Sequence, residues 1–127
     1  MKNRKKLWII LVSIIIVSNI PPFTGIFRFF LDQKHYRYSN SDGTSTFYEF
    51  MSRDFEMAKR RQAHCLLKKP DLKDRKHYRL FSKNPLAFWR WRLYFFDERY
   101  KLPYKNWEEI EKTRKSAAGV SGCITEF

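Results

Sequence analysis

One stretch of the chain, residues 7–27, contains no charged side chain and constrains the fold more than any other feature. Its first part, LWIILVSIIIVSNI (7–20), has eleven Ile, Leu, Val or Trp residues among fourteen and no polar stripe at helical spacing. As a single helix, residues 7–27 would span about 31 Å, which is roughly the thickness of the hydrocarbon core of a bilayer. Pro21 and Pro22 interrupt such a helix, because proline lacks the backbone donor and clashes with the preceding turn. We therefore expect the regular helix to end or kink near Ile20.

The residues before this run carry four positive charges, at Lys2, Arg4, Lys5 and Lys6. A basic flank followed by an apolar core fits an uncleaved signal anchor, a cleaved secretion signal or a buried helix of a soluble protein. A cleaved signal needs small residues at its cleavage site, and no Ala occurs before Ala58. A soluble core helix rarely has six Ile in fourteen residues directly behind a basic cluster. We interpret residues 1–6 as a basic flank and residues 7–27 as a transmembrane signal anchor.

The distribution of charge predicts which end of the anchor lies inside the cell. The formal net charge of the chain is +13, and every acidic residue follows the apolar run. Clusters of Lys and Arg beside a membrane helix stay on the cytoplasmic side. We therefore expect a cytoplasmic N-terminus and place residues 28–127 on the other side of the membrane.

Aromatic side chains gather around one cation where the apolar run ends. Rings beside a single Arg suit the headgroup layer, because the guanidinium can reach the phosphates while the rings stay in apolar surroundings. This pattern predicts a membrane-proximal connector at residues 28–45, although the same phenylalanines would also serve as the first core residues of a soluble domain. The expected membrane-interface residues are Trp8, Phe27, Arg28, Phe29 and Phe30.

The turn sequence SNSDG (39–43) predicts a short β-hairpin between residues 35–38 and 44–48. Thr46 and Glu49 instead match a capping box, which predicts a helix from about residue 47. The two expected elements overlap at residues 44–48, so one of them must be shorter than its pattern.

The rest of the chain predicts a helical basic domain at residues 46–115. Its first helix should end at about Lys68, because Pro70 stops it. Asn84 and Pro85 then open a second helix, which carries too much apolar surface to pack on one side only. Asn106 caps a third helix. Residues 116–127 are rich in small side chains and predict a flexible tail.

No motif predicts catalysis or cofactor binding. The spacing of His35, His64 and His77 does not match a metal site, and Cys65 adjoins His64 in a geometry that forbids a Cys–His pair on a helix. No window holds the glycines of a phosphate-binding loop. We expect no catalytic residue, no metal ligand and no cofactor, and the sequence leaves open whether Cys65 pairs with Cys123.

The basic and aromatic composition favours binding over chemistry. Trp and Arg together are typical of protein-interaction hot spots, and basic side chains near a bilayer are attracted to anionic headgroups. Nucleic-acid binding would use the same residue types, but a domain outside the cell does not meet intracellular nucleic acid. The candidate partner-binding residues are Phe88, Trp89, Arg90, Trp91, Arg92 and Trp107.

Two stretches, YRLFSKNPLAFWRWRLYFFDERYKLPYKNWEEIEK (78–112) and HYRYSNSDGT (35–44), resemble small uncharacterised single-pass inner-membrane proteins of Bacteroidetes-type bacteria. The resemblance covers most of the region after the anchor. It implies a setting in the bacterial inner (plasma) membrane and no catalytic residue. With the orientation that the charges predict, the C-terminal domain lies in the periplasm.

Together these patterns predict a mainly α protein with one transmembrane helix, a small three-helix domain and a candidate β-hairpin. The function that fits is a single-pass, membrane-anchored, non-catalytic accessory protein whose basic domain docks on membrane-complex subunits or on the lipid surface. The alternative is a membrane-tethered nucleic-acid-binding protein. The expected partners are the lipid bilayer and other membrane-protein subunits.

Overall fold

The computed structural model describes residues 2–32, 36–50, 54–116 and 122–125. The chain divides into two compact units. The N-terminal unit comprises residues 1–33 and 83–97, and the sheet unit comprises residues 34–82 and 98–127. The protein is mainly helical, as the sequence predicts. Its small sheet has three strands, whereas the sequence predicts a two-stranded hairpin.

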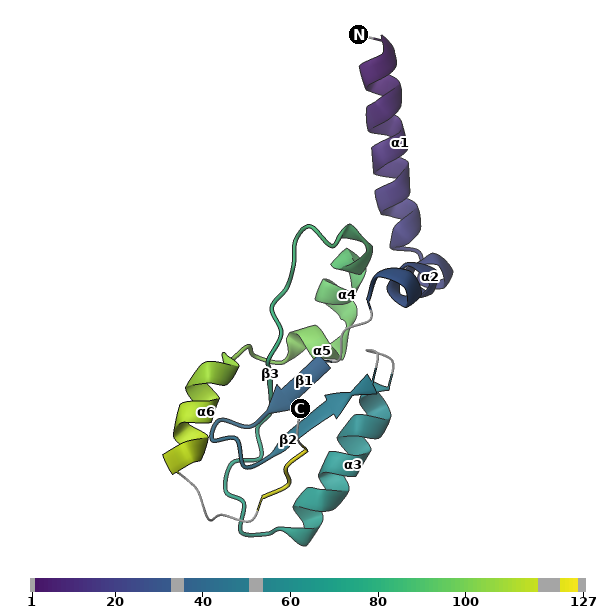
Figure 1. Ribbon diagram of the computed structural model, residues 1–127. Coiled ribbons are helices and arrows are strands. Elements are labelled where there is room, and N and C mark those ends of the chain that lie inside the picture. Colours follow the sequence, from purple (N-terminus) through teal and green to yellow (C-terminus); the bar gives the residue numbers. More distant parts are fainter. Residues whose placement is uncertain (1, 33–35, 51–53, 117–121, 126–127) are drawn as a thin grey trace. The chain divides into compact units, whose positions relative to one another are not determined.

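The N-terminal unit is built from α1 (Lys2–Ser18), α2 (Pro21–Leu31), the 3-10 helix η2 (Phe88–Arg90) and α4 (Trp91–Phe96) (Figure 1). The predicted end of the first helix near Ile20 is confirmed, because α1 ends at Ser18 and a new helix follows. Pro21 and Pro22 take the first positions of α2, where the missing backbone donors have no partner to lose.

The sheet unit contains β1 (Tyr36–Ser39), β2 (Thr46–Glu49) and β3 (Tyr78–Arg79), in the antiparallel order β2-β1-β3. The hairpin predicted from the SNSDG turn is therefore confirmed, and His35, at its predicted start, lies outside the described residues. Gly43 in the turn has a φ of 73°, and a Cβ there would come within 3.1 Å of Ile110. Three helices complete the unit: α3 (Phe55–Lys68), α5 (Glu98–Lys101) and α6 (Trp107–Ser116).

The overlap between hairpin and helix is resolved in favour of the strand. The predicted helix start at residue 47 is wrong, since β2 occupies residues 46–49 and α3 begins only at Phe55. Neither side chain of the capping box caps a helix. The Thr46 hydroxyl donates to the carbonyl oxygen of Thr125 at 2.9 Å, and Glu49 is paired with Arg99. The predicted end of this helix before Pro70 is correct.

The second predicted helix is broken into η2, α4 and α5. The Asn84 side chain accepts a hydrogen bond from the Leu86 backbone, yet helical structure begins only at Phe88. Asp97 then adopts an extended conformation between α4 and α5, with φ −81° and ψ 134°. The third helix forms as predicted, and Asn106 Oδ1 accepts from the Glu108 N–H at 3.1 Å.

Residues 122–125, which belong to the predicted flexible tail, are instead held beside β2. The Thr46 N–H donates to the Cys123 carbonyl at 2.9 Å, and the Thr125 N–H donates to the Thr46 carbonyl at 3.2 Å. The remaining residues of that predicted tail after Ser116 (117–121 and 126–127) lie outside the described residues.

The core of the sheet unit is aromatic and encloses one ion pair. Tyr38 is fully buried and stacks on Phe47 at a centroid distance of 4.7 Å, with Phe55 packed beside it at 5.3 Å. Glu49 accepts two hydrogen bonds from Arg99, at 2.7 Å from Nε and 3.0 Å from a terminal nitrogen. A bidentate pair of this kind satisfies both charges in a region with little access to water.

Removing one partner of the buried ion pair should strongly destabilise the fold. In Glu49→Gln the Arg99 charge stays buried without its carboxylate, so we expect a loss of about 3–5 kcal/mol in the free energy of unfolding. Urea unfolding of the full-length chain in mild detergent measures this loss. Glu98→Gln is the matched control, because Glu98 forms an exposed ion pair with Lys59 and should leave the midpoint unchanged. Equal urea midpoints for the two variants would show that the buried pair contributes no more to stability than the exposed one.

Candidate functional site

The turn between α1 and α2 is fixed by polar side chains. Thr24 Oγ1 lies 2.7 Å from the Ser18 carbonyl, and both Ser18 and Thr24 are buried. The Asn19 side chain donates to the Phe88 carbonyl at 2.8 Å and accepts from the Arg92 N–H at 2.8 Å. Asn19 therefore joins the α1–α2 break to a segment about seventy residues away in sequence.

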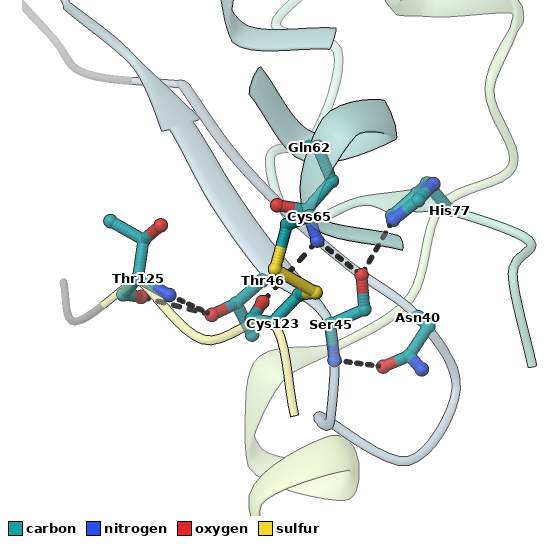
Figure 2. The surroundings of a disulfide bond; sticks show 8 residues. All are labelled: Asn40, Ser45, Thr46, Gln62, Cys65, His77, Cys123 and Thr125. Carbon is teal, nitrogen blue, oxygen red and sulfur yellow. Dashed lines mark hydrogen bonds between the residues drawn. A yellow bond between two sulfur atoms is a disulfide. The ribbon is translucent and has the colours of Figure 1, made fainter. Parts of the chain in front are cut away.

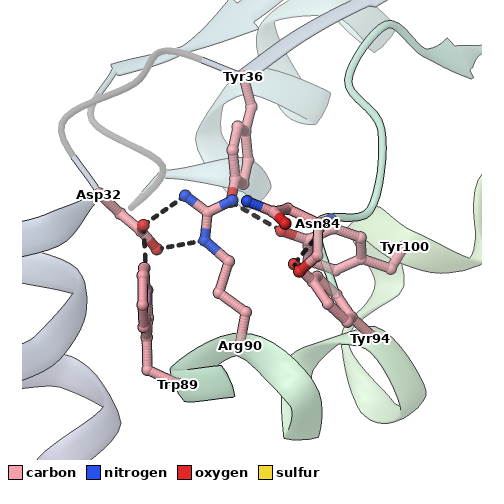
Figure 3. A network of polar contacts seen from close by, with 7 residues as sticks. All are labelled: Asp32, Tyr36, Asn84, Trp89, Arg90, Tyr94 and Tyr100. Atoms are coloured by element: carbon pink, nitrogen blue, oxygen red, sulfur yellow. Dashed lines mark hydrogen bonds and ion pairs between the residues drawn. The ribbon is translucent and has the colours of Figure 1, made fainter. Parts of the chain in front are cut away.

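A buried carboxylate holds the same segment to the end of α2. Asp32 accepts a hydrogen bond from Trp89 Nε1 at 3.2 Å and forms a two-pronged ion pair with Arg90, with Nε at 2.7 Å (Figure 3). Phe27 meets Phe88 edge to face at 6.4 Å. These contacts make α1, α2, η2 and α4 one packed unit.

Much of the outer surface of this unit is apolar. Side chains of α1 that are about half exposed or more follow one another along the helix, from Leu7 (58%) through Trp8 (67%) to Ile16 (59%). On α2 the exposed apolar side chains are Phe23, Ile26, Phe29, Phe30 and Leu31. A helix in the core of a soluble protein would bury most of this surface.

Within the described residues, no single helix is both long enough and apolar enough to cross a membrane. The stretch Asn3–Ser18 of α1 and the helix α2 have the required length and composition together, but the pair is bent by 94° at the break.

The sheet unit contains a disulfide between Cys65 of α3 and Cys123 of the C-terminal segment, with the two Cα atoms 5.9 Å apart (Figure 2). Cys123 forms a small buried cluster with Leu66 and Leu72, and Cys65 packs against this cluster. Both cysteines are therefore structural in this fold, and neither is a free nucleophile.

A serine and a histidine meet in the surroundings of the disulfide. Ser45 Oγ lies 3.0 Å from His77 Nε2 and also receives a hydrogen bond from Gln62 (Figure 2). The Ser45 N–H donates to Asn40 Oδ1 at 3.0 Å. Ser45 is fully buried, so a substrate would not reach its hydroxyl in this conformation. The arrangement acts as a hydrogen-bond network that joins β2, α3 and the approach to β3.

The surroundings of His77 favour the neutral form of its imidazole. Burial lowers the pKa of His77 below its usual range, and the smaller opposing influence of Asp74 does not restore it. Burial acts to raise the pKa of Asp74, but hydrogen bonds from the hydroxyl and N–H of Ser41 and from the Lys76 N–H lower it overall.

A cavity of about 280 Å³ lies between α3, β2 and the C-terminal segment. Phe47, Ala58 and Ile124 supply apolar walls, and Gln62 and the disulfide lie beside them. Among the described residues that line it, Arg61 is the one charged side chain. The cavity thus offers space and one cation, but no acid–base pair.

The six candidate partner-binding residues belong to both units of the chain. Phe88, Trp89 and Arg90 are half-buried and engaged within the N-terminal unit, whereas Trp91 and Arg92 are exposed. Trp107 belongs to the sheet unit, where Arg114 lies over its ring at 5.9 Å. Of the predicted interface residues, Trp8, Phe29 and Phe30 are exposed, while Phe27 and Arg28 are half-buried.

Several residues with important contacts could not be recognised from the sequence alone. Asp32 and Asn19 are isolated polar residues whose partners lie far along the chain. Ser45 and His77 match no nucleophile motif. Leu86, Phe95 and Phe96 are strongly exposed. The sequence indicates such exposure only through the excess of apolar residues in this stretch.

In the part of the chain that the structure describes, no three His, Cys, Asp or Glu side chains come together in a way that would hold a metal ion. Comparisons with protein-family models, with curated proteins and with solved structures find no significant match to this chain.

The half-buried His77 predicts how stability depends on pH. Because the pKa of His77 is lower in the folded state, the unfolded chain binds a proton more readily, and the free energy of unfolding should fall as the pH drops through about 6.5. Urea titrations at pH 7.5 and pH 5.5 measure the difference.

The effect is assigned by two variants. His77→Gln should remove most of the loss between the two pH values, whereas His64→Gln, at an exposed position, should retain it. An undiminished loss in His77→Gln would refute the role of the buried imidazole.

Proposed function

We propose that this chain is a single-pass, membrane-anchored, non-catalytic accessory protein. Its N-terminus lies in the cytoplasm of a bacterium, α1 crosses the inner membrane, and the sheet unit lies in the periplasm. The basic, aromatic-rich region after α1 docks on membrane-complex subunits or on the lipid surface.

The observation that carries the proposal is the uncovered apolar surface of α1. Its 17 residues would span about 26 Å, and the uncharged part that begins at Leu7 covers about 18 Å of that length. For α1 to cross a bilayer, the Lys and Arg side chains before Leu7 must extend toward the headgroups. Four basic residues precede the apolar run, which fits retention of that end on the cytoplasmic side.

The disulfide supports the proposed side of the sheet unit. Disulfides persist in oxidising compartments such as the periplasm and are rare in the cytosol of mesophiles. A pair that links α3 to the C-terminal segment is therefore consistent with a sheet unit that has crossed the membrane.

Docking is supported by the side chains that remain exposed. Trp91, which is 41% exposed, and Arg92 are the two available members of the predicted set in the N-terminal unit. Trp107 is half-exposed in the sheet unit. Trp and Arg are the residue types that dominate binding energy at protein interfaces.

Nucleic-acid binding is the second candidate, and the same disulfide weighs against it. A basic domain that meets nucleic acid would have to lie in the cytosol, where the pair between Cys65 and Cys123 would be reduced. The side of the membrane thus separates the two candidates.

The test uses the fact that the chain has two cysteines. Membranes from one sample of cells are washed at alkaline pH to test whether the chain is retained. A second sample is quenched with acid, and the chain is then treated with a maleimide polymer before or after reduction. We expect the chain in the washed membranes, unmodified without reductant and doubly modified after it. Cys65→Ser is the control and should take one polymer under both conditions.

Two outcomes would contradict the proposal. Release of the chain by the alkaline wash would exclude membrane anchoring. Double modification without reductant would place the sheet unit on the reducing side and favour the nucleic-acid alternative.

A further inference from the structure

The N-terminal unit distributes polar and apolar side chains in reverse of a water-soluble fold. Its buried described residues include Ser18, Thr24 and Asp32, which are at most 4% exposed. Its large aliphatic and aromatic side chains lie mostly outside. Proteins in water bury such side chains, whereas proteins in lipid turn polar groups inward and apolar groups outward.

Helix α2 illustrates this reversal. Its polar side chains are Thr24, which is buried, and Arg28, which is half-buried. Phe23, Ile26 and Phe30, at positions i, i+3 and i+7, form an exposed apolar stripe. Because α2 is bent by 94° from the α1 axis, an α1 helix along the membrane normal would place α2 in the membrane plane.

A second segment joins this surface from far along the chain. Residues 84–96 present three strongly exposed apolar side chains, Leu86 (84%), Phe95 (76%) and Phe96 (72%). The segment is fastened to the α1–α2 break by Asn19 and to the end of α2 by Asp32. Helix η2 contacts both α1 and α2, and Figure 1 shows this segment beside the break.

We propose that α2 and residues 84–96 lie in the interfacial layer of the same bilayer that α1 crosses, with lipid acyl chains covering their exposed apolar side chains. The chain thus returns to the membrane after the sheet that follows α2. This inference rests on the proposed function and names lipid as the partner of the N-terminal unit.

Lipid fits better than a protein partner because of how the surface is arranged. Apolar side chains are exposed at successive positions of α1, on every side of the helix, and the surface continues onto α2, which is nearly perpendicular. A fluid bilayer covers such a surface without a shaped partner. The exposed cations Lys83 and Arg92 border the apolar part and suit anionic headgroups.

The experiment uses the purified full-length chain alone in vesicles of phosphatidylethanolamine and phosphatidylglycerol. A carbene-generating reagent dissolved in the acyl region labels residues in contact with lipid, and mass spectrometry maps the label. Interfacial elements place their apolar faces about 5–10 Å into the acyl boundary, so residues 21–31 and 84–96 should be labelled about tenfold more than Leu67. Leu67 is the control, because it is 77% exposed in the sheet unit.

A double variant tests the second segment directly. Phe95→Asp combined with Phe96→Asp should lower the label in residues 84–96 severalfold and leave the label in α1 unchanged. Leu67→Asp is the matched control and should change neither.

The outcomes separate this inference from the proposed function. Label confined to α1 would overturn the inference and leave the anchor intact, whereas an unlabelled α1 would overturn both. Label in residues 84–96 that disappears when the protein-to-lipid ratio is raised would assign the surface to a second copy of the chain and overturn lipid as its partner.

Discussion

The apolar surface of α1 is the constraint on which the rest of the structure depends. Each Leu, Ile or Val side chain removed from water contributes about 1.5–3 kcal/mol, and α1 exposes such residues along most of its length. The described residues of the N-terminal unit leave much of this surface exposed, since Asn19, Thr24 and Asp32 organise only the C-terminal end of α1 and the helix that follows. We propose that a bilayer is the surrounding that makes this surface favourable, and a membrane would also account for the positions of the cations and the disulfide.

The sheet unit has to be stable with few residues, and it uses cross-links for this purpose. The disulfide joins residues 58 positions apart, and closing a loop of that size is worth about 4 kcal/mol through restriction of the unfolded chain. The ion pair between Glu49 and Arg99 and the stacked rings around Tyr38 connect β2 to distant helices. The segment 122–125 pairs with the start of the outer edge of β2, which would otherwise be open there to another strand.

Local signals in the sequence predicted the features that depend on neighbouring residues. Proline marked the end of α1 and the end of α3, SNSDG marked the hairpin, and Asn106 marked α6. Distant partners decided the rest. Thr46 and Glu49 resemble a capping box, but Thr125 and Arg99 hold them in a strand. Asn19 binds the backbone of Phe88 and Arg92, which helps to explain why the second predicted helix starts late. The pairing of Cys65 with Cys123 likewise follows from the fold, because spacing alone left it open.

The orientation of the helices in a bilayer tests the central claim most directly. Solid-state NMR of the full-length chain, labelled with [15N]isoleucine in aligned bilayers, separates amide N–H vectors along the membrane normal from those in the membrane plane. Ile9, Ile10, Ile14, Ile15 and Ile16 lie on α1, and Ile26 lies on α2. We expect the α1 isoleucine signals at the 15N chemical shift of N–H vectors along the membrane normal. We expect the Ile26 signal at the 15N chemical shift of N–H vectors in the membrane plane. In-plane shifts for the α1 isoleucines would contradict the central claim.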